Sequence, residues 1–183
     1  DPFTFDWKND KDWKLRDNQA LVVENFCDKV KTQKELLMYA VMRFGKSFTA
    51  MSCAKKMGYS KVLIVSAKAD VAGEWKKTIQ MPKCFKEYKF IYDNLLKTEP
   101  NLIQNTLYSK SEQNKVAVFL TLQNLYGRDN NGNDIKARLQ QVYDTEFDLI
   151  IVDETHYGVW NTKLGGSLSK EEKEQDGEEL LKN

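Results

Sequence analysis

The strongest constraint on the fold of this chain is an apolar run that ends in two adjacent carboxylates. Residues 147–152 read Phe-Asp-Leu-Ile-Ile-Val and lead directly into Asp153 and Glu154. A run of this length, rich in Ile and Val, predicts a strand that is buried on both faces, as in a parallel sheet. The two carboxylates would then lie at the carboxyl end of a strand, where open α/β sheets bind their ligands.

A candidate phosphate-binding loop lies upstream of this strand. Residues 40–47 fit the spacing of a P-loop, with Ala40 where the first Gly is usual. A glycine allows the tight turn that directs backbone amides at a phosphate, a lysine adds positive charge, and a serine hydroxyl can bind Mg²⁺. An exposed lysine at a helix start is the alternative, because Gly-Lys-Ser also occurs by chance. The candidate cofactor-binding residues here are Arg43, Phe44, Gly45, Lys46, Ser47 and Phe48.

The two carboxylates can be assigned different roles if the loop binds a nucleotide. Asp153 would hold Mg²⁺ together with Ser47, directly or through water. Glu154 would polarise an attacking water as a general base, so Lys46 and Glu154 are the catalytic candidates. Solvated acids at a strand end are common by themselves, and the assignment therefore depends on the loop upstream.

Apolar periodicity divides the chain into alternating strands and helices, which predicts an α/β fold with a doubly wound, mostly parallel sheet and helices on both faces. Helices are expected at 16–30 with Asp17 as the N-cap, at 46–57 ended by Gly58, at 70–79 and at 135–143. Strands are expected at 62–65, 88–92, 116–120 and 147–152, and a mixture of helix and loop at 93–114.

The segment before the phosphate loop is ambiguous. Residues 35–41 are mostly apolar, and a strand normally precedes a P-loop, so we expect a strand here. Thr32 and Glu35 also fit a capping box, which would instead favour the start of a helix.

Composition is that of an ordinary globular protein. The 183 residues are 41% hydrophobic and 30% charged, and the net charge is only +1, so any DNA-binding surface must be local. Apolar runs of about five residues are far below the ~20 that span a bilayer, and no signal peptide is visible. We therefore expect a cytoplasmic protein with no membrane segment, in which Cys27 and Cys53 are buried, reduced thiols.

Several short motifs occur in an order that resembles a known family. They are residues 15–19, 40–47, 63–75, 120–123 and 153–156. In this order they resemble the Q, I, Ia, Ib and DExH-type II motifs of superfamily 2 helicases and translocases. More narrowly, they resemble the motor subunits of type I and type III restriction enzymes.

This resemblance implies a domain organisation. Residues 15–162 would form the first RecA-like domain of an ATP-driven motor, after an aromatic-rich lead-in at 1–14. Residues 163–183 would be a charged segment, helical or disordered. The chain begins with Asp and shows neither motif III nor a second RecA-like domain with its arginine finger. We therefore expect a fragment of a longer protein that hydrolyses ATP weakly by itself.

The resemblance also implies roles for residues outside the phosphate loop. ATP and Mg²⁺ would be the cofactors, with Gln19 reading the adenine edge and Arg16 supporting it. Lys68 and Gln123 would contact the nucleic-acid backbone. The residues expected to couple nucleotide state to movement are Thr155 and His156, the single histidine of the chain.

The resulting hypothesis is an ATP-hydrolysing motor domain of a restriction-type DNA helicase or translocase. Its expected partners are DNA, duplex rather than single-stranded, a second RecA-like domain, and modification or specificity subunits. A P-loop kinase or transferase is an alternative, although the four arginines of the chain are few for an arginine-bearing lid. A nucleotide-binding interaction module without hydrolysis is the third alternative.

Overall fold

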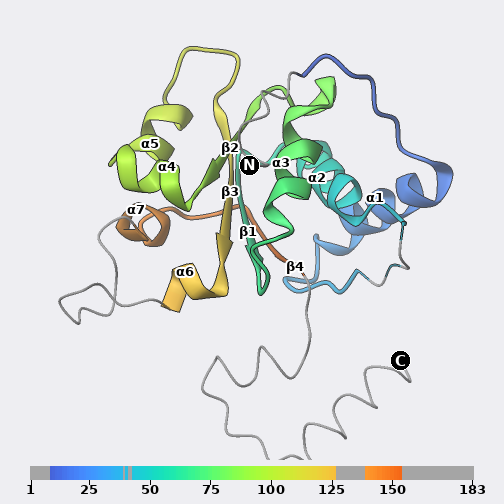
Figure 1. Ribbon diagram of the computed structural model, residues 1–183. Coiled ribbons are helices and arrows are strands. Elements are labelled where there is room, and N and C mark those ends of the chain that lie inside the picture. Colours follow the sequence, from blue (N-terminus) through green and yellow to red (C-terminus); the bar gives the residue numbers. More distant parts are fainter. Residues whose placement is uncertain (1–8, 39, 41–42, 127–138, 154–183) are drawn as a thin grey trace, which may run out of the picture.

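Parallel strands form a single sheet in this computed structural model, and helices cover both of its faces (Figure 1). The structure describes residues 9–38, 40, 43–126 and 139–153. Within these residues the spatial order of the strands is β2-β3-β1-β4, and every neighbouring pair is parallel. The expected α/β architecture is confirmed. The strands are β1 (Lys61–Ser66), β2 (Tyr88–Tyr92), β3 (Lys115–Thr121) and β4 (Leu149–Asp153).

The register of the sheet aligns the carboxyl ends of three strands. Ser66, the last residue of β1, pairs with Thr121 of β3 on one side and with Asp153 of β4 on the other. Loops that follow these strands therefore emerge at one edge of the sheet, where parallel sheets collect their ligand-binding groups.

The first face of the sheet is covered by α1 (Asp17–Lys29), α2 (Lys46–Lys56) and α3 (Ala72–Gln80) (Figure 1). Met51 of α2 and Trp75 of α3 are almost completely buried here, together with Ile64 of β1. The short 3-10 helix η1 (Lys83–Phe85) adds Phe85 to the same cluster. This cluster holds α2 and α3 against the first face of the sheet.

The opposite face carries four short helices (Figure 1). Buried aliphatic side chains of these helices, Leu96, Ile103 and Val142 among them, pack on Val116 and Val118 of β3. Alternate residues of β3 thus serve two separate cores, which explains its continuous apolar sequence. The helices are α4 (Asp93–Thr98), α5 (Leu102–Leu107), α6 (Leu122–Tyr126) and α7 (Gln140–Tyr143).

The end of the lead-in is tied to the segment after α3. The backbone N–H of Lys11 donates to the carbonyl of Met81 at 3.2 Å, and Lys83 donates back to the carbonyl of Lys11 at 2.8 Å. Trp13 packs edge-on against Phe48 of α2, with 5.5 Å between ring centroids. Trp13 therefore acts as the aromatic anchor that the sequence predicts.

Within the described residues, helix positions largely follow the expected pattern, with a wrong N-cap assignment at α1; residues 135–138 of the helix expected at 135–143 lie outside the described residues. Arg16 rather than Asp17 is the N-cap, and Asp17 is the first helical residue. The backbone N–H of Arg16 is satisfied by the side-chain oxygen of Gln19 at 2.9 Å, which is one half of a capping box. Gly58 follows α2 with a φ of +72°, as expected for the residue after a helix end.

The strand expected at 35–41 is not formed over its first part. Residues 35–38 are neither strand nor helix, and the side chain of Leu37 is 71% exposed. An apolar run becomes a strand only where a neighbouring strand supplies hydrogen-bond partners, and residues 35–38 pair with none of the described strands. The apolar composition and the position before a P-loop therefore gave the wrong assignment for residues 35–38.

The expectation that the last strand is buried on both faces is also wrong. Leu149 and Ile151 pack against the first core, but Ile150 and Val152 are 57% and 42% exposed. In the described sheet β4 is an edge strand, and the helices of the second face pack on its neighbours. Within the described residues, therefore, only one face of β4 packs against a core.

Candidate functional site

In the described part of the candidate phosphate loop, two residues lie in the left-handed region of backbone conformation. Gly45, the N-cap of α2, has a φ of +82°, and Arg43 has a φ of +63°. Glycine adopts this conformation freely, whereas it costs an L-residue about 1–2 kcal/mol. Strain at Arg43 is retained only where the surroundings hold the backbone in place.

Two side chains from the start of α1 hold this loop. Arg16 donates from Nη2 to the carbonyls of Arg43 at 3.2 Å and of Phe44 at 2.5 Å. Gln19 donates from Nε2 to the same Phe44 carbonyl at 2.7 Å. Arg16 and Gln19, the pair expected to recognise adenine, therefore stabilise the strained loop backbone in this structure.

Gly45 lies directly beneath the Gln19 side chain. A Cβ added to Gly45 would meet the Gln19 Nε2 atom at 2.6 Å, closer than real Cβ contacts allow. Gln19 is itself only 4% exposed and is fixed by hydrogen bonds at both ends of its amide. The glycine is thus required by close approach as well as by its positive φ.

Ser47 contacts α3 through its hydroxyl group. Its Oγ atom donates to Oε1 of Glu74 at 3.1 Å, across 27 residues of sequence. Ser47 is only 4% exposed, whereas Lys46 beside it is exposed at the start of α2. The lysine is therefore available to an anion at the helix N-terminus, and the serine hydroxyl is oriented by Glu74.

Asp153 contacts Trp75, the residue that follows Glu74 on α3. The indole Nε1 of Trp75 donates to Oδ2 of Asp153 at 2.8 Å. Trp75 is 2% exposed and belongs to the first core cluster, so its position is set by packing. The first turn of α3 therefore contacts both candidate metal ligands through the neighbouring residues Glu74 and Trp75.

Ser47 and Asp153 together suit a hard divalent cation. A hydroxyl and a carboxylate are oxygen ligands, and Mg²⁺ typically takes one or two protein oxygens with phosphate oxygens and water completing its shell. Within the described residues no group of three or more His, Cys, Asp or Glu side chains could hold a metal by itself. The donor set fits a metal that arrives with a phosphate ligand.

The remaining candidates have different environments. Phe48 is buried in the first core, where it stacks near Trp13 and Phe85, so only its backbone could meet a ligand. Lys68 and Gln123 are exposed, just beyond the ends of β1 and β3. These adjacent strands end in register, so both residues lie at the carboxyl edge of the sheet.

Three candidates lie outside the described residues. They are Glu154, the proposed general base, and the expected coupling residues Thr155 and His156. Asp153 is the last described residue before them and ends β4 at the carboxyl edge.

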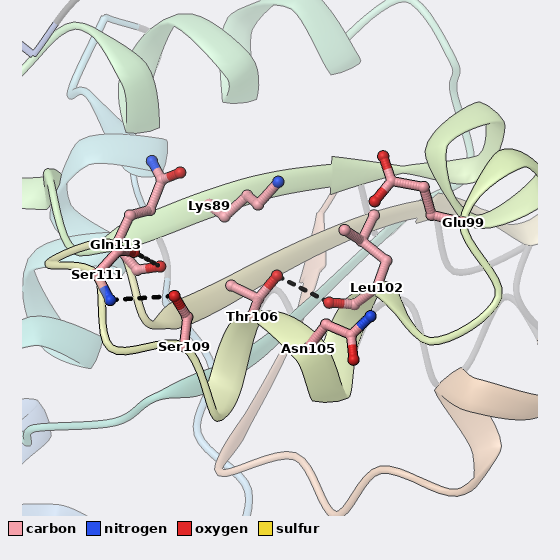
Figure 2. Close-up of a pocket in the computed structure, with 8 residues that line it drawn as sticks. All are labelled: Lys89, Glu99, Leu102, Asn105, Thr106, Ser109, Ser111 and Gln113. Atoms are coloured by element: carbon pink, nitrogen blue, oxygen red, sulfur yellow. Dashed lines mark hydrogen bonds between the residues drawn. The ribbon is translucent and has the colours of Figure 1, made fainter.

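A separate surface hollow of about 210 Å³ lies at the other side of the sheet, beside β2 and α5 (Figure 2). Its lining is mainly polar, and several of these groups bond to the chain itself, as Thr106 does to the carbonyl of Leu102 at 2.8 Å. None of the predicted site residues lines it. The hollow is therefore separate from the candidate site.

The sequence pattern singled out neither Glu74 nor the contact between Trp75 and Asp153. Trp75 does pack in the core, but it also donates its indole N–H to Asp153. An acid beside a tryptophan on a helix after a strand is an ordinary pattern. The signal is therefore spatial, because it depends on how the first turn of α3 approaches α2 and the end of β4.

Comparison with known proteins shows the family of the chain. The family described as type III restriction enzyme, res subunit, matches residues 12–173, which is most of the chain. The chain belongs to this res-subunit family. Its parallel sheet with helices is consistent with the RecA-like P-loop fold of res-subunit domains.

A curated relative of this res-subunit domain occurs in Mycoplasma pneumoniae. It carries the name "Putative type II restriction enzyme and methyltransferase RM.MpnORF110P C-terminus" and is 31% identical over 183 aligned positions. The alignment covers 96% of this chain but 24% of the relative, so the chain spans about a quarter of that protein's length. No solved structure matches the chain significantly.

The described residues of this res-subunit domain contain no helix that is long and apolar enough to cross a membrane. The cysteines are free, and Cys53 is buried, as expected. Cys27 on α1 is only partly buried, so the expectation of a fully buried thiol is wrong there.

Proposed function

We propose that this chain is the ATP-binding and ATP-hydrolysing first domain of a DNA motor in a restriction enzyme. The observation that carries the proposal is that α3 contacts Ser47 and Asp153 through adjacent residues, at distances of 3.1 and 2.8 Å. These contacts connect the loop and the acidic strand end through one helical turn, which supports a shared site at the carboxyl edge of the sheet. P-loop NTPases use these two elements for nucleotide and metal.

Each part of the loop has a role in this proposal. Lys46 binds the β- and γ-phosphates, and the amides at the start of α2 face the anion. Ser47 and Asp153 hold Mg²⁺, which when bound neutralises charge on the phosphate oxygens. Glu154 accepts a proton from the attacking water, and ATP and water yield ADP and phosphate.

Arg16 and Gln19 link adenine recognition to the loop. Both already bond to the loop carbonyls, yet the Gln19 amide retains one hydrogen and one lone pair for an adenine edge. A nucleotide bound here would therefore be sensed by the same side chains that hold Arg43 in its strained conformation.

The proposed track is DNA, with duplex preferred to single strands. Lys68 and Gln123 would contact phosphates, which gives affinity without sequence readout. The second RecA-like domain would supply an arginine finger, worth about 10³–10⁵ in rate in related systems, so this domain alone should turn over slowly. Modification or specificity subunits are further proposed partners, since the relative is named as both a restriction enzyme and a methyltransferase.

ATPase assays of the protein at its natural full length test the proposal. We expect hydrolysis that duplex DNA stimulates more than single-stranded DNA or RNA. Lys46→Ala should lose nucleotide affinity, because the phosphate charge is no longer matched. Glu154→Gln should bind ATP but hydrolyse it at least about 10²-fold more slowly, since general-base catalysis contributes that much.

Lys56→Ala is the matched control for the lysine. Lys56 is exposed on the same helix but at its opposite end, about 15 Å away at 1.5 Å per residue. Its removal should leave nucleotide affinity unchanged. Equal hydrolysis by wild type and Glu154→Gln would exclude Glu154 as the base, and the absence of any hydrolysis with any nucleic acid would favour a binding module instead.

A further inference from the structure

We propose that Glu74 and Trp75 are positioning residues that orient the two metal ligands, an inference that rests on the proposed function. Trp75 donates a hydrogen bond to the carboxylate of Asp153, and Glu74 accepts one from the hydroxyl of Ser47. Neither side chain need touch the nucleotide. Their effect would be on how Ser47 and Asp153 present oxygen atoms to Mg²⁺.

The chemistry of the two contacts is complementary. A carboxylate has only acceptor atoms, so a donor such as an indole N–H can fix its orientation while it binds a cation. A hydroxyl binds a cation through a lone pair and must still donate its hydrogen to an acceptor, which a carboxylate such as Glu74 supplies. Each candidate ligand therefore has the kind of partner that its own metal-binding form requires.

The contact to Asp153 is held rigidly. Trp75 is 2% exposed and packs in the first core, so its N–H cannot follow a moving partner. The 2.8 Å bond to Oδ2 therefore sets the rotation of the carboxylate at the end of β4. Outer contacts of this kind commonly change metal affinity by about 10–100-fold.

The contact to Ser47 is made at the side of α3 that faces α2. Ser47 is 4% exposed, and its Oγ–H donates to Glu74 at 3.1 Å. Glu74 is itself exposed, so its position depends on the helix that carries it more than on packing of its own side chain. It adds a negative charge beside the cation, which solvent screens in part.

One helical turn thus connects the phosphate loop with the acidic strand. Successive residues of a helix point about 100° apart, so Glu74 reaches α2 while Trp75 reaches β4. Ser47 and Asp153 are then oriented relative to each other by α3, which directly follows β1 in the chain. Removal of either partner should weaken metal binding more than nucleotide binding.

The test is binding of a fluorescent ADP analogue to the full-length protein, with saturating Mg²⁺ and again with a chelator. In the wild type Mg²⁺ should tighten binding. Trp75→Phe keeps the ring but removes the N–H, and we expect the Mg²⁺-dependent tightening to fall by about 10-fold. Glu74→Leu should act in the same direction, and Glu74→Gln, which keeps an acceptor oxygen, should restore most of the effect. Affinity in chelator should stay unchanged throughout.

Direct Mn²⁺ titration by electron paramagnetic resonance, in the presence of ADP, provides a readout that does not depend on the fluorophore. We expect Trp75→Phe and Glu74→Leu to raise the Mn²⁺ dissociation constant by a similar factor of about 10. Trp13→Phe and Glu24→Leu are the matched controls. Trp13 packs against Phe48 and Glu24 lies exposed on α1, and neither contacts a candidate metal ligand.

The outcomes separate the two proposals. If the wild type binds the analogue with no Mg²⁺ dependence, the metal site fails, and with it both the proposed function and this inference. If the wild type depends on Mg²⁺ but Trp75→Phe and Glu74→Leu behave like their controls, only the positioning role is overturned. A loss of affinity that is equal with and without Mg²⁺ would mean that the two residues support folding alone, which also overturns it.

Discussion

Arg43 and Gly45 place two left-handed residues within three positions of a loop, and only one of them is a glycine. The side chains of Arg16 and Gln19 bond to the carbonyls beside them and offset the strain at Arg43. The conformation of the loop is therefore determined by residues that precede it by more than twenty positions. The conformation of this candidate loop therefore cannot be explained from its own residues alone.

Gly45→Ala should disrupt the conformation of the loop in two ways, through backbone strain and through a steric clash with Gln19. The φ of +82° would cost about 1–2 kcal/mol of unfolding free energy in an L-residue, and the new Cβ would meet Gln19 Nε2 at 2.6 Å. We expect lower stability in urea and a marked loss of nucleotide affinity, measured by titration of a fluorescent ATP analogue.

Gly58→Ala is the control for backbone strain. Gly58 has a similar φ of +72°, but a Cβ there would meet nothing within 4 Å. It should therefore lose a similar amount of stability from strain while nucleotide affinity stays unchanged. Equal effects of the two variants on affinity would argue against a role for the Gly45–Gln19 contact.

At the scale of elements, β4 is the strand whose surroundings differ most from expectation. Val152 on β4 is 42% exposed, whereas Val118 on β3 is fully buried. Both are valines in parallel strands, so the same substitution can measure how much the burial of each side chain contributes to the free energy of unfolding. The comparison needs a side chain of unchanged shape, which threonine provides.

We predict that Val152→Thr changes the free energy of unfolding by no more than about 0.5 kcal/mol, as for most surface substitutions. Val118→Thr should lower the free energy of unfolding by about 1–3 kcal/mol, because it buries a hydroxyl group for which the apolar core provides no hydrogen-bond partner. Urea unfolding of both variants measures the difference. A large loss at Val152 would show that residues beyond the described part of the chain cover this face.

Sequence patterns predicted the strands and α2 because those elements satisfy local rules. β1 and β3 are buried on both faces and carry continuous apolar runs, and Gly58 ends α2 as its residue type suggests. Residues 35–38 did not follow, because an extended segment also needs a neighbouring strand to pair with. Composition carries no information about that neighbour.

Local sequence patterns also allowed part of the candidate site to be proposed from the sequence. The loop residues and Asp153 belong to short patterns that are visible in the sequence, and the structure brings Arg16 and Gln19 to the loop. Glu74 could not be found this way, because its contact with Ser47 spans 27 residues and depends on the approach of α3 to α2. The adenine role expected for Gln19 remains a prediction.

At the scale of the whole molecule, buried thiols and phenols limit stability at alkaline pH. Burial raises the pKa of the Cys53 thiol to about 12, and burial likewise raises the pKa of Cys84 and, more strongly, of the Tyr88 phenol. The Tyr88 hydroxyl donates to the carbonyl of Tyr59, which favours its protonated form. These groups lie in α2, η1 and β2, so the effect is not confined to one element.

The sign of the pH effect follows from proton binding. Above pH 9 or so the unfolded chain releases these protons while the folded chain keeps them, so the free energy of unfolding falls as pH rises. Each such group contributes a slope of at most about 1.4 kcal/mol per pH unit. We expect urea midpoints to decrease steadily between about pH 8.5 and 11.

Cys53→Ala is the variant that tests the assignment of this slope. It removes one buried thiol, so the decline of stability with alkaline pH should become shallower, whatever the change in absolute stability. A decline of unchanged steepness would assign the effect to Cys84 and the tyrosines instead.

The contact between Gly45 and Gln19 restricts which residues homologues can carry at these two positions. A Cβ at position 45 would lie only 2.6 Å from the amide nitrogen of the Gln19 side chain, so a side chain at position 45 fits only if the residue at position 19 gives way. Homologues that carry a side chain at the first position should therefore have a shorter one at the second. The two positions would evolve as a linked pair, although one lies in the helix α1 and the other immediately precedes α2.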